Sequence, residues 1–234
     1  MKIIINGLGR IGKLVFRRLC DENLHKNILM VNEKAGSASD QEYFLRYDTV
    51  HGTWGDDLCF KNGCLNYKDH SIDVMTEGSI ENISFPKSEK FLVVDCTGVN
   101  KSEKLLEPYF ERKASYVLIS APIESSNVQN IVYGINHQSI DTSAYKIFTA
   151  ASCTTNCLAP IVKVLEENIG IKHGSITTIH NITNSQTIVD APKNNLRRSR
   201  SGINSLIPTT TGSARAISLI YPELKGRLNG HAVR

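Results

Sequence analysis

A glycine-rich turn near the amino terminus is the feature that most constrains the fold of this 234-residue chain. Residues 2–6 form a short apolar run that predicts a strand, and apolar spacing over 11–20 predicts a helix. Between them, Gly7, Gly9 and Gly12 follow the pattern Gly-x-Gly-x-x-Gly. In that context Gly7 permits a tight turn, Gly9 lets a pyrophosphate approach backbone N–H groups, and Gly12 lets helix and strand pack closely. The pattern predicts dinucleotide binding.

Two charged residues after a second predicted strand, 27–32, bear on which dinucleotide is bound. Glu33 lies about 20 residues beyond the glycine turn, where an acidic side chain accepts the adenosine ribose hydroxyls and favours NAD. Lys34 is placed to pair with a 2′-phosphate, so NADP use stays open. The alternative is that both are solvated loop charges.

Strand-like and helix-like runs alternate through the first 150 residues. Runs at 91–96 and 116–120 flank a helical segment at 101–112. This alternation predicts an α/β fold with a doubly wound parallel sheet of the Rossmann type. Short runs within 57–75, two of them separated by Asn62-Gly63, predict an inserted β-hairpin.

The pattern changes near residue 150, so we expect a nucleotide-binding domain at 1–150 and a second domain at 151–234. The run 175–180 alternates like a strand, and 183–208 is a long polar, arginine-rich stretch that is functional or disordered. Between 150 and 175 the apolar spacing of a helix predicts one buried face formed by Leu158, Ile161, Val162 and Leu165.

Composition excludes several classes of protein. With 41% hydrophobic and 21% charged residues the chain is ordinarily globular. A formal charge of +4 with no basic and aromatic interleaving argues against nucleic-acid binding. No window approaches the roughly 18 apolar residues of a membrane span, so we expect no membrane insertion.

The six cysteines lack a disulfide or zinc pattern. The amino terminus enters a strand directly instead of a signal peptide, which predicts reduced thiols and a cytoplasmic protein. No second Cys/His pair stands at the spacing of a structural zinc site, so we expect no metal. Cys157 is expected to be a small buried apolar residue.

The stretch Ala150-Ala-Ser-Cys-Thr-Thr-Asn-Cys157 contains the candidate nucleophile. It places Cys153 where an apolar strand end, 145–150, meets the first turn of a helix. There the positive end of the helix dipole and free N–H groups favour thiolate over thiol. Cys153 is therefore predicted to carry covalent chemistry beside a dinucleotide.

Thiol catalysis needs a base within hydrogen-bond reach. Among seven histidines, His180 ends the strand-like run after the Cys153 helix, and an adjacent return strand would bring it back to the sulfur. A purely structural role for His180 is the alternative.

Hydroxyls and guanidinium groups gather in the second half, as in sites that bind phosphate. A polar loop with surface arginines is the alternative. The members of this group are Ser152, Thr154, Thr183, Arg197, Arg198, Arg200, Thr209 to Thr211, Gly212, Arg215 and Arg234.

Five motifs in the same order resemble phosphorylating glyceraldehyde-3-phosphate dehydrogenases over essentially the whole chain, and the cysteine motif is highly specific. These are Asn6-Gly-Leu-Gly-Arg-Ile-Gly12, Ser152-Cys-Thr-Thr-Asn-Cys-Leu-Ala-Pro160, Thr177-Thr-Ile-His180, Thr211-Gly212 and Asn229-Gly-His-Ala-Val-Arg234.

The resemblance implies Cys153 as nucleophile and His180 as its base. It implies a substrate phosphate on Thr183 and Arg234, inorganic phosphate on Ser152, Thr154, Thr211 and Gly212, and a homotetramer. Residues implied to line the NAD or NADP site, besides the glycines, are Arg10, Ile11, Glu33, Thr97, Gly98 and Ser120.

Departures from the family pattern refine this expectation. Glu33-Lys34 replaces an Asp-Pro type of pair. Segment 183–208 partly resembles erythrose-4-phosphate dehydrogenases. Against that relative, Thr211-Gly212 retains the inorganic-phosphate element that is expected of a phosphorylating enzyme. The pattern is most similar to paralogues associated with arsenate resistance, whose implied role is to load arsenate in place of phosphate for export by a partner transporter. Segments that carry this similarity are 32–36, 47–54 and 187–192.

Length is a further departure, because family members continue past the residue that matches Arg234. The resemblance therefore implies a chain shortened at its carboxyl end, with an incomplete α+β catalytic domain at 151–234. An inactive dinucleotide-binding remnant is the competing hypothesis.

Overall fold

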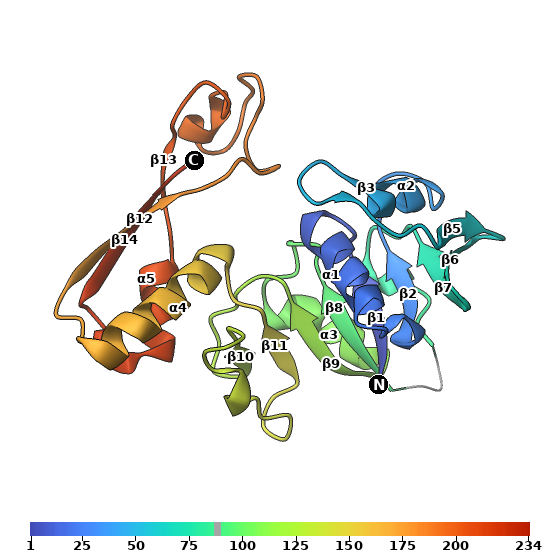
Figure 1. Ribbon diagram of the computed structural model, residues 1–234, viewed down its shortest axis with the longest axis horizontal. Coiled ribbons are helices and arrows are strands. Elements are labelled where there is room, and N and C mark those ends of the chain that lie inside the picture. The colour runs from blue at the N-terminus through green and yellow to red at the C-terminus, as the bar shows by residue number, and fades with distance from the viewer. Residues whose placement is uncertain (87–89) are drawn as a thin grey trace. The chain divides into compact units, whose positions relative to one another are not determined.

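The computed structural model describes residues 1–86 and 90–234 and divides into two compact units (Figure 1). Unit 1 comprises Met1–Ile131 and Ser139–Ala151, and unit 2 comprises Val132–Gln138 and Ser152–Arg234. Each unit has its own sheet, so each is described separately.

Unit 1 is built on a nine-stranded sheet. Its strands are β1 (Lys2–Asn6), β2 (Ile28–Asn32), β5 (Leu58–Lys61), β6 (Cys64–Tyr67), β7 (His70–Met75), β8 (Phe91–Asp95), β9 (Ala114–Ile119), β10 (Val128–Asn130) and β11 (Ile147–Thr149). Their order is β10-β11-β9-β8-β1-β2-β7-β6-β5, and every neighbouring pair from β10 to β7 is parallel. The chain winds outward from β1 through β2, then crosses to β8 on the other side. The predicted doubly wound α/β fold is confirmed.

Helices cover both faces of this sheet. Neighbouring strand residues point to opposite faces, so Ile4 joins the core beneath α3 (Glu103–Glu111), and Ile5 joins the core beneath α1 (Arg10–Asp21). Phe16 of α1 is completely buried there. A short helix, α2 (Asp40–Arg46), and a two-stranded sheet of β3 (Tyr47–Asp48) and β4 (Gly52–Thr53) complete the unit, with 3₁₀ turns at His25–Asn27 and Ile80–Asn82.

The predicted hairpin is present, but it is not a separate insertion. Asn62 and Gly63 both have positive φ, 55° and 81°, as a two-residue turn with the twist of a hairpin requires. β7 pairs parallel with β2, and β5 and β6 then add antiparallel strands to the edge of the main sheet. The hairpin therefore extends the Rossmann sheet.

The glycine turn joins β1 to α1 in a backbone conformation that depends on its glycines. Gly7 has φ +91°, a left-handed conformation that glycine adopts without strain. A Cβ added at Gly12 would lie 1.8 Å from the Gly7 carbonyl oxygen, whereas one added at Gly9 would meet nothing within 4 Å. The first turn of α1 thus packs against the loop only because residue 12 lacks a side chain.

We expect Gly12→Ala to lower the free energy of unfolding by at least about 2 kcal/mol, because backbone must move to relieve the overlap. Gly9→Ala is the matched control within the same turn and should leave the urea midpoint close to wild type. Equal midpoints for the two variants would contradict this account of the turn.

Unit 2 contains a three-stranded mixed sheet and two helices. Its elements are α4 (Cys153–Asn168), β12 (Gly174–Ile179), β13 (Pro208–Thr210), α5 (Ser213–Ile220) and β14 (Leu228–Val233), with 3₁₀ turns at Leu196–Ser199 and Pro222–Leu224. β14 lies between β12, to which it is parallel, and β13, to which it is antiparallel. α5 contacts both α4 and β14.

The buried face of α4 differs from the predicted one. Val162 is buried, but Ile161 and Leu165 are 52% and 40% exposed, and Cys157 is also exposed. The buried residues of α4 are Thr155, Ala159 and Val162. Apolar spacing alone does not tell which of two overlapping stripes on a helix will be covered by a neighbouring element.

Candidate active site

Cys153 is the first residue of α4. Ser152 before it is extended, and its Oγ accepts the N–H of Thr155 at 3.1 Å, which caps the helix. The first turn contains no acidic residue. The Cys153 side chain is exposed at the positive end of the helix, where developing negative charge on sulfur is stabilised.

His180 lies next to this thiol. It follows β12, and its backbone N–H donates to the Val233 carbonyl at 2.8 Å, so β14 holds it in place. The distance from Cys153 Sγ to His180 Nε2 is 3.2 Å. The return strand that was expected to bring the two residues together is β12, and it places them in direct contact.

A second hydrogen bond fixes the tautomer of His180. Its Nδ1 lies 2.7 Å from the carbonyl oxygen of Asn181. A carbonyl oxygen only accepts, so Nδ1 carries the hydrogen, and Nε2 of the neutral ring is free to accept the thiol proton. The pair is thus arranged for proton transfer from sulfur to imidazole.

The sulfur opens onto a cavity of about 390 Å³ between α4 and β12. Thr154 and Cys157 line it together with the catalytic candidates. Cys157 is therefore a wall of this cavity and not the core residue that its spacing predicted.

Thr183 and Arg234 meet further along unit 2. Arg234 Nη1 donates to Thr183 Oγ1 at 3.1 Å and lies 3.5 Å from Ser185 Oγ. The backbone N–H of Thr183 donates to Oε1 of buried Gln186 at 3.1 Å, which anchors this end of the 183–208 loop. The two residues implied to hold one phosphate are thus adjacent.

Arg198 belongs to the same group, although sequence did not single it out from its neighbours. Its Nη2 donates to Thr209 Oγ1 at 3.0 Å, and its Nε is buried without a partner among the described residues. Burial, followed by repulsion from Arg198, lowers the pKa of Arg234. Two close guanidinium groups with hydroxyl partners favour an anion between them. Arg200, by contrast, is paired with Asp190.

The remaining predicted anion ligands lie at two helix starts. Ser152 and Thr154 begin α4, while Thr211 and Gly212 precede α5, where Ser213 N–H donates to Thr211 Oγ1 at 3.2 Å. α4 and α5 pack against each other. Both starts offer free N–H groups to an anion.

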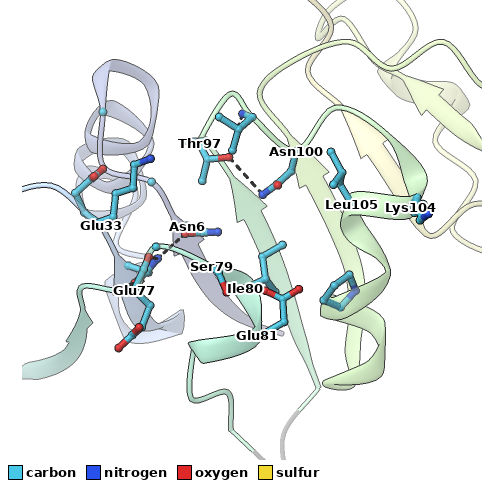
Figure 2. A pocket seen from close by; sticks show the side chains of 18 residues that line it. Asn6, Glu33, Glu77, Ser79, Ile80, Glu81, Thr97, Asn100, Lys104 and Leu105 are labelled. Atoms are coloured by element: carbon cyan, nitrogen blue, oxygen red, sulfur yellow. Dashed lines mark hydrogen bonds between the residues drawn. The ribbon is translucent and has the colours of Figure 1, made fainter.

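A second cavity, of about 410 Å³, lies in unit 1 at the carboxyl ends of β1, β2, β7 and β8, where doubly wound sheets bind nucleotides (Figure 2). Of the predicted cofactor residues, those that line it are Gly7, Gly9, Glu33, Lys34 and Thr97. Asn6, Asn32, Glu77 and Asn100, which sequence reasoning missed, line it as well.

Glu33 is half-buried at this cavity and is held there by two backbone hydrogen bonds. Its Oε2 accepts the N–H of Leu8 in the glycine turn at 2.7 Å, and its Oε1 accepts the N–H of Ala35 at 2.9 Å. Each carboxylate oxygen keeps a further lone pair for a ligand. Ribose hydroxyls are suitable donors to it.

The other predicted cofactor residues do not line the cavity. Arg10 points its guanidinium at Asp48, with Nη1 to Oδ2 at 2.5 Å, and Ile11 is 51% exposed on α1. Gly98 has φ +71° in the turn after Thr97, and the Ser120 N–H donates to the Asp95 carbonyl. Gly12 lies beneath the turn, as described above.

The unit 1 cavity fits a dinucleotide on three counts. Space above Gly9 lets a phosphate reach the backbone, the start of α1 supplies free N–H groups, and Glu33 supplies an acceptor.

Within the described ranges, no three His, Cys, Asp or Glu residues cluster as metal ligands would. In those same ranges, no helix has both the length and the apolar character that a bilayer crossing requires.

Fold and site together define a dehydrogenase-type protein, with a dinucleotide-binding unit and a thiol–imidazole pair. Sequence profiles agree: "Glyceraldehyde 3-phosphate dehydrogenase, NAD binding domain" matches residues 1–103, and the C-terminal domain of the same family matches 152–234. The chain belongs to the glyceraldehyde 3-phosphate dehydrogenase family.

Several curated relatives carry that name. Glyceraldehyde-3-phosphate dehydrogenase 3 of Nostoc sp. is 43% identical, and the alignment covers 100% of this chain and 69% of the relative. The enzyme of Geobacillus stearothermophilus is 40% identical, and glyceraldehyde-3-phosphate dehydrogenase 1 of Bacillus cereus is 39% identical, each with the same coverage.

Proposed function

We propose that this chain is an NAD(P)-dependent, phosphorylating glyceraldehyde-3-phosphate dehydrogenase that acts through a cysteine thioester. We assign cofactor binding to residues 1–150 and catalysis to 151–234. The observation that carries the proposal is the 3.2 Å contact between Cys153 Sγ and His180 Nε2 at the start of α4. Family membership supports the substrate, glyceraldehyde 3-phosphate.

In the first step Cys153 loses its proton to Nε2 of His180, the sulfur adds to the aldehyde carbon, and His180 returns that proton to the carbonyl oxygen to give a thiohemiacetal. His180 then takes the hydroxyl proton while hydride leaves that carbon, and an acyl thioester on Cys153 remains. Bound NAD supplies the hydride acceptor. The Nδ1–H bond to Asn181 keeps Nε2 facing the sulfur throughout.

In the second step an oxygen of inorganic phosphate attacks the thioester carbon, the carbon–sulfur bond breaks, and the Cys153 sulfur leaves as a thiolate that recovers its proton from His180. Ser152, Thr154, Thr211 and Gly212 would hold this phosphate through hydroxyls and helix-start N–H groups. The phosphate already present on the substrate would bind Thr183 and Arg234, which are already in contact.

Arg198 completes this proposed substrate-phosphate site. We expect Arg198→Ala to raise KM for glyceraldehyde 3-phosphate by roughly 10–100-fold with a smaller change in kcat, because the lost contact serves ground and transition states alike. Arg197→Ala, one residue away and exposed, is the matched control. Initial rates over a range of substrate concentrations test this, and equal KM values for the two variants would remove Arg198 from the site.

Cofactor choice rests on Glu33 and Lys34. The fixed Glu33 carboxylate favours NAD, because it would repel a 2′-phosphate, whereas exposed Lys34 would attract one. We propose NAD as the main cofactor, with NADP as a second substrate.

One spectrophotometric assay tests the reaction. Reduced-cofactor formation is followed from glyceraldehyde 3-phosphate or erythrose 4-phosphate, with NAD or NADP, and with phosphate, arsenate or neither anion. We expect turnover that requires glyceraldehyde 3-phosphate and an anion. Turnover only with erythrose 4-phosphate would instead support the erythrose-4-phosphate dehydrogenase alternative.

We propose the arsenate-associated branch as the specialisation of this enzyme, supported by segments 32–36, 47–54 and 187–192. Arsenate and phosphate are nearly isosteric, so one anion site would serve both, and the product would be a labile arseno-phosphoglycerate. Its consumer would be an arsenical exporter. A neighbouring gene for such a membrane exporter is the expected genomic observation, and its absence would count against this branch.

An inactive remnant is the competing class of function, and thiol reactivity separates the two. In an active site Cys153 should react with iodoacetamide at least about tenfold faster than the other five cysteines, which are also free. Mass spectrometry of peptides after timed alkylation measures each rate. Equal rates at exposed Cys59 and Cys153 would favour the remnant.

We also propose a cytoplasmic homotetramer. Unit 2 leaves Ile161, Ile179 and Leu206 exposed by 52%, 82% and 79%, and assembly would remove such side chains from water. Light scattering after gel filtration should give four times the 25.9 kDa chain mass. A monomeric mass at micromolar concentration would contradict this.

A further inference from the structure

Buried polar side chains cross the carboxyl ends of three neighbouring strands beneath the unit 1 cavity. Asn32, Asn6 and Asp95 end β2, β1 and β8, and the parallel register places Asn6 beside both of the others. They are only 2%, 4% and 0% exposed. Polar groups buried in this way cost free energy unless they are hydrogen-bonded, so their partners show what the arrangement holds in place.

The hydrogen bonds form a chain from Asn32 to Asp95 through Tyr109 of α3, and in this chain each group donates to the next. Asn32 Nδ2 donates to Asn6 Oδ1 at 2.8 Å, and Asn6 Nδ2 donates to the Tyr109 hydroxyl at 2.5 Å. That hydroxyl donates to Asp95 Oδ2 at 2.8 Å. Since a carboxylate only accepts, the Tyr109 proton points to Asp95, and its oxygen must accept from Asn6. The orientation of the Asn6 carboxamide follows from this chain.

Both ends of the chain of bonds reach loops that line the cavity. Asn32 accepts the Glu77 N–H at 2.8 Å and donates to the Glu77 carbonyl at 3.0 Å. Asp95 Oδ1 accepts the N–H of Thr97 at 2.9 Å, and Oδ2 accepts Asn100 Nδ2 at 2.7 Å. Figure 2 shows Glu77 on one side of Asn6 and Thr97 with Asn100 on the other. One network therefore ties both loops to the strand ends.

Tyr109 is completely buried and is not part of the cavity wall, whereas Asn6 is. Burial, followed by the negative charge of Asp95, raises the pKa of the Tyr109 hydroxyl, so it remains a donor. Asn6 Nδ2 has two hydrogens, and only the one donated to Tyr109 has a partner among the described residues. The second hydrogen is thus unused, on a residue that lines the cavity.

We propose that Tyr109, backed by Asp95, is a positioning residue for dinucleotide binding: it holds the Asn6 carboxamide so that its second N–H donates to the bound cofactor. The inference rests on the proposed function. It makes Tyr109 act on the cofactor only through Asn6, without touching it, and that dependence is testable.

A double-mutant cycle on NAD affinity provides the test, with titration calorimetry on the full chain. Tyr109→Phe removes the acceptor of Asn6 and should raise the Kd for NAD by roughly 5–10-fold, and Asn6→Ala should raise it at least as much. In the Asn6→Ala background, Tyr109→Phe should add less than about twofold, because the residue it positions is gone. Tyr67→Phe is the matched control, because Tyr67 is a buried tyrosine on β6 that lies away from the cavity. The Kd of this variant for NAD should equal that of the wild type.

The outcomes separate this inference from the proposed function. If wild type shows no saturable NAD binding, the proposed function fails and the inference fails with it. If wild type binds and Tyr109→Phe matches it, or if the two effects simply add, only the inference is overturned. Should Tyr109→Phe fail to fold by circular dichroism, Asp95→Asn takes its place in the cycle, since an amide oxygen keeps the shape but binds the tyrosine proton more weakly.

Discussion

Replacing Cys153 by serine is expected to lower dehydrogenase turnover at least about a thousandfold. Serine keeps the size and the cap of α4, but its hydroxyl does not give up a proton to His180 as readily as a thiol does. The thiohemiacetal and the acyl thioester then cannot form. Initial rates at saturating glyceraldehyde 3-phosphate, NAD and phosphate measure the effect.

Binding measurements show whether the loss is chemical. Cys153→Ser should bind NAD with wild-type Kd, because the dinucleotide cavity lies wholly in unit 1. Cys59→Ser, which alters an exposed thiol on β5, should keep full turnover. A Cys153→Ser protein within tenfold of the wild-type rate would refute covalent catalysis by this residue.

His180→Gln is expected to lower kcat by roughly 10²–10⁴-fold, because glutamine offers hydrogen bonds but takes no proton from the thiol or the hydroxyl. The rate of Cys153 alkylation should fall in the same variant, since the sulfur loses its base. Rapid-quench or steady-state kinetics give kcat, and timed iodoacetamide labelling gives the alkylation rate.

His173→Gln is the matched control, because this exposed histidine precedes β12 in the same unit and lies outside the Cys153 cavity. Its kcat and its alkylation rate should both equal wild type. If His180→Gln kept both values as well, the 3.2 Å contact would have a structural role only, and another base would have to serve Cys153.

The local sequence pattern was sufficient to predict those parts of the fold that depend on neighbouring residues. The run 2–6, the three glycines and the helix after them appear where predicted, because turn geometry and side-chain periodicity act over a few residues. The Asn62-Gly63 hairpin turn is correct for the same reason, since both residues adopt positive φ. The placement of Cys153 at a helix start likewise follows from the sequence beside it.

Predictions from the sequence pattern were wrong where the burial or the pairing of an element depends on a segment that is distant in the chain. Ile161 and Leu165 have helical spacing, yet the buried side of α4 carries Thr155 and Ala159. The 57–75 hairpin was expected as an insertion, but pairing of β7 with β2 makes it an edge of the main sheet. In both cases a segment that is distant in the chain determines which face of a helix is buried or with which strand a strand pairs.

The alternation of strands and helices, the thiol at the start of α4 and the glycine turn are predictable from the sequence, because each depends on residues that are close in the chain. The folded structure adds what the sequence did not show: His180 in direct contact with Cys153, Arg198 bonded to Thr209, and Tyr109 bonded to Asn6. Cys153 and His180 are 27 positions apart, and Asn6 and Tyr109 are 103 apart. Contacts of that range are made by strand pairing and helix packing, which spacing along a chain does not encode.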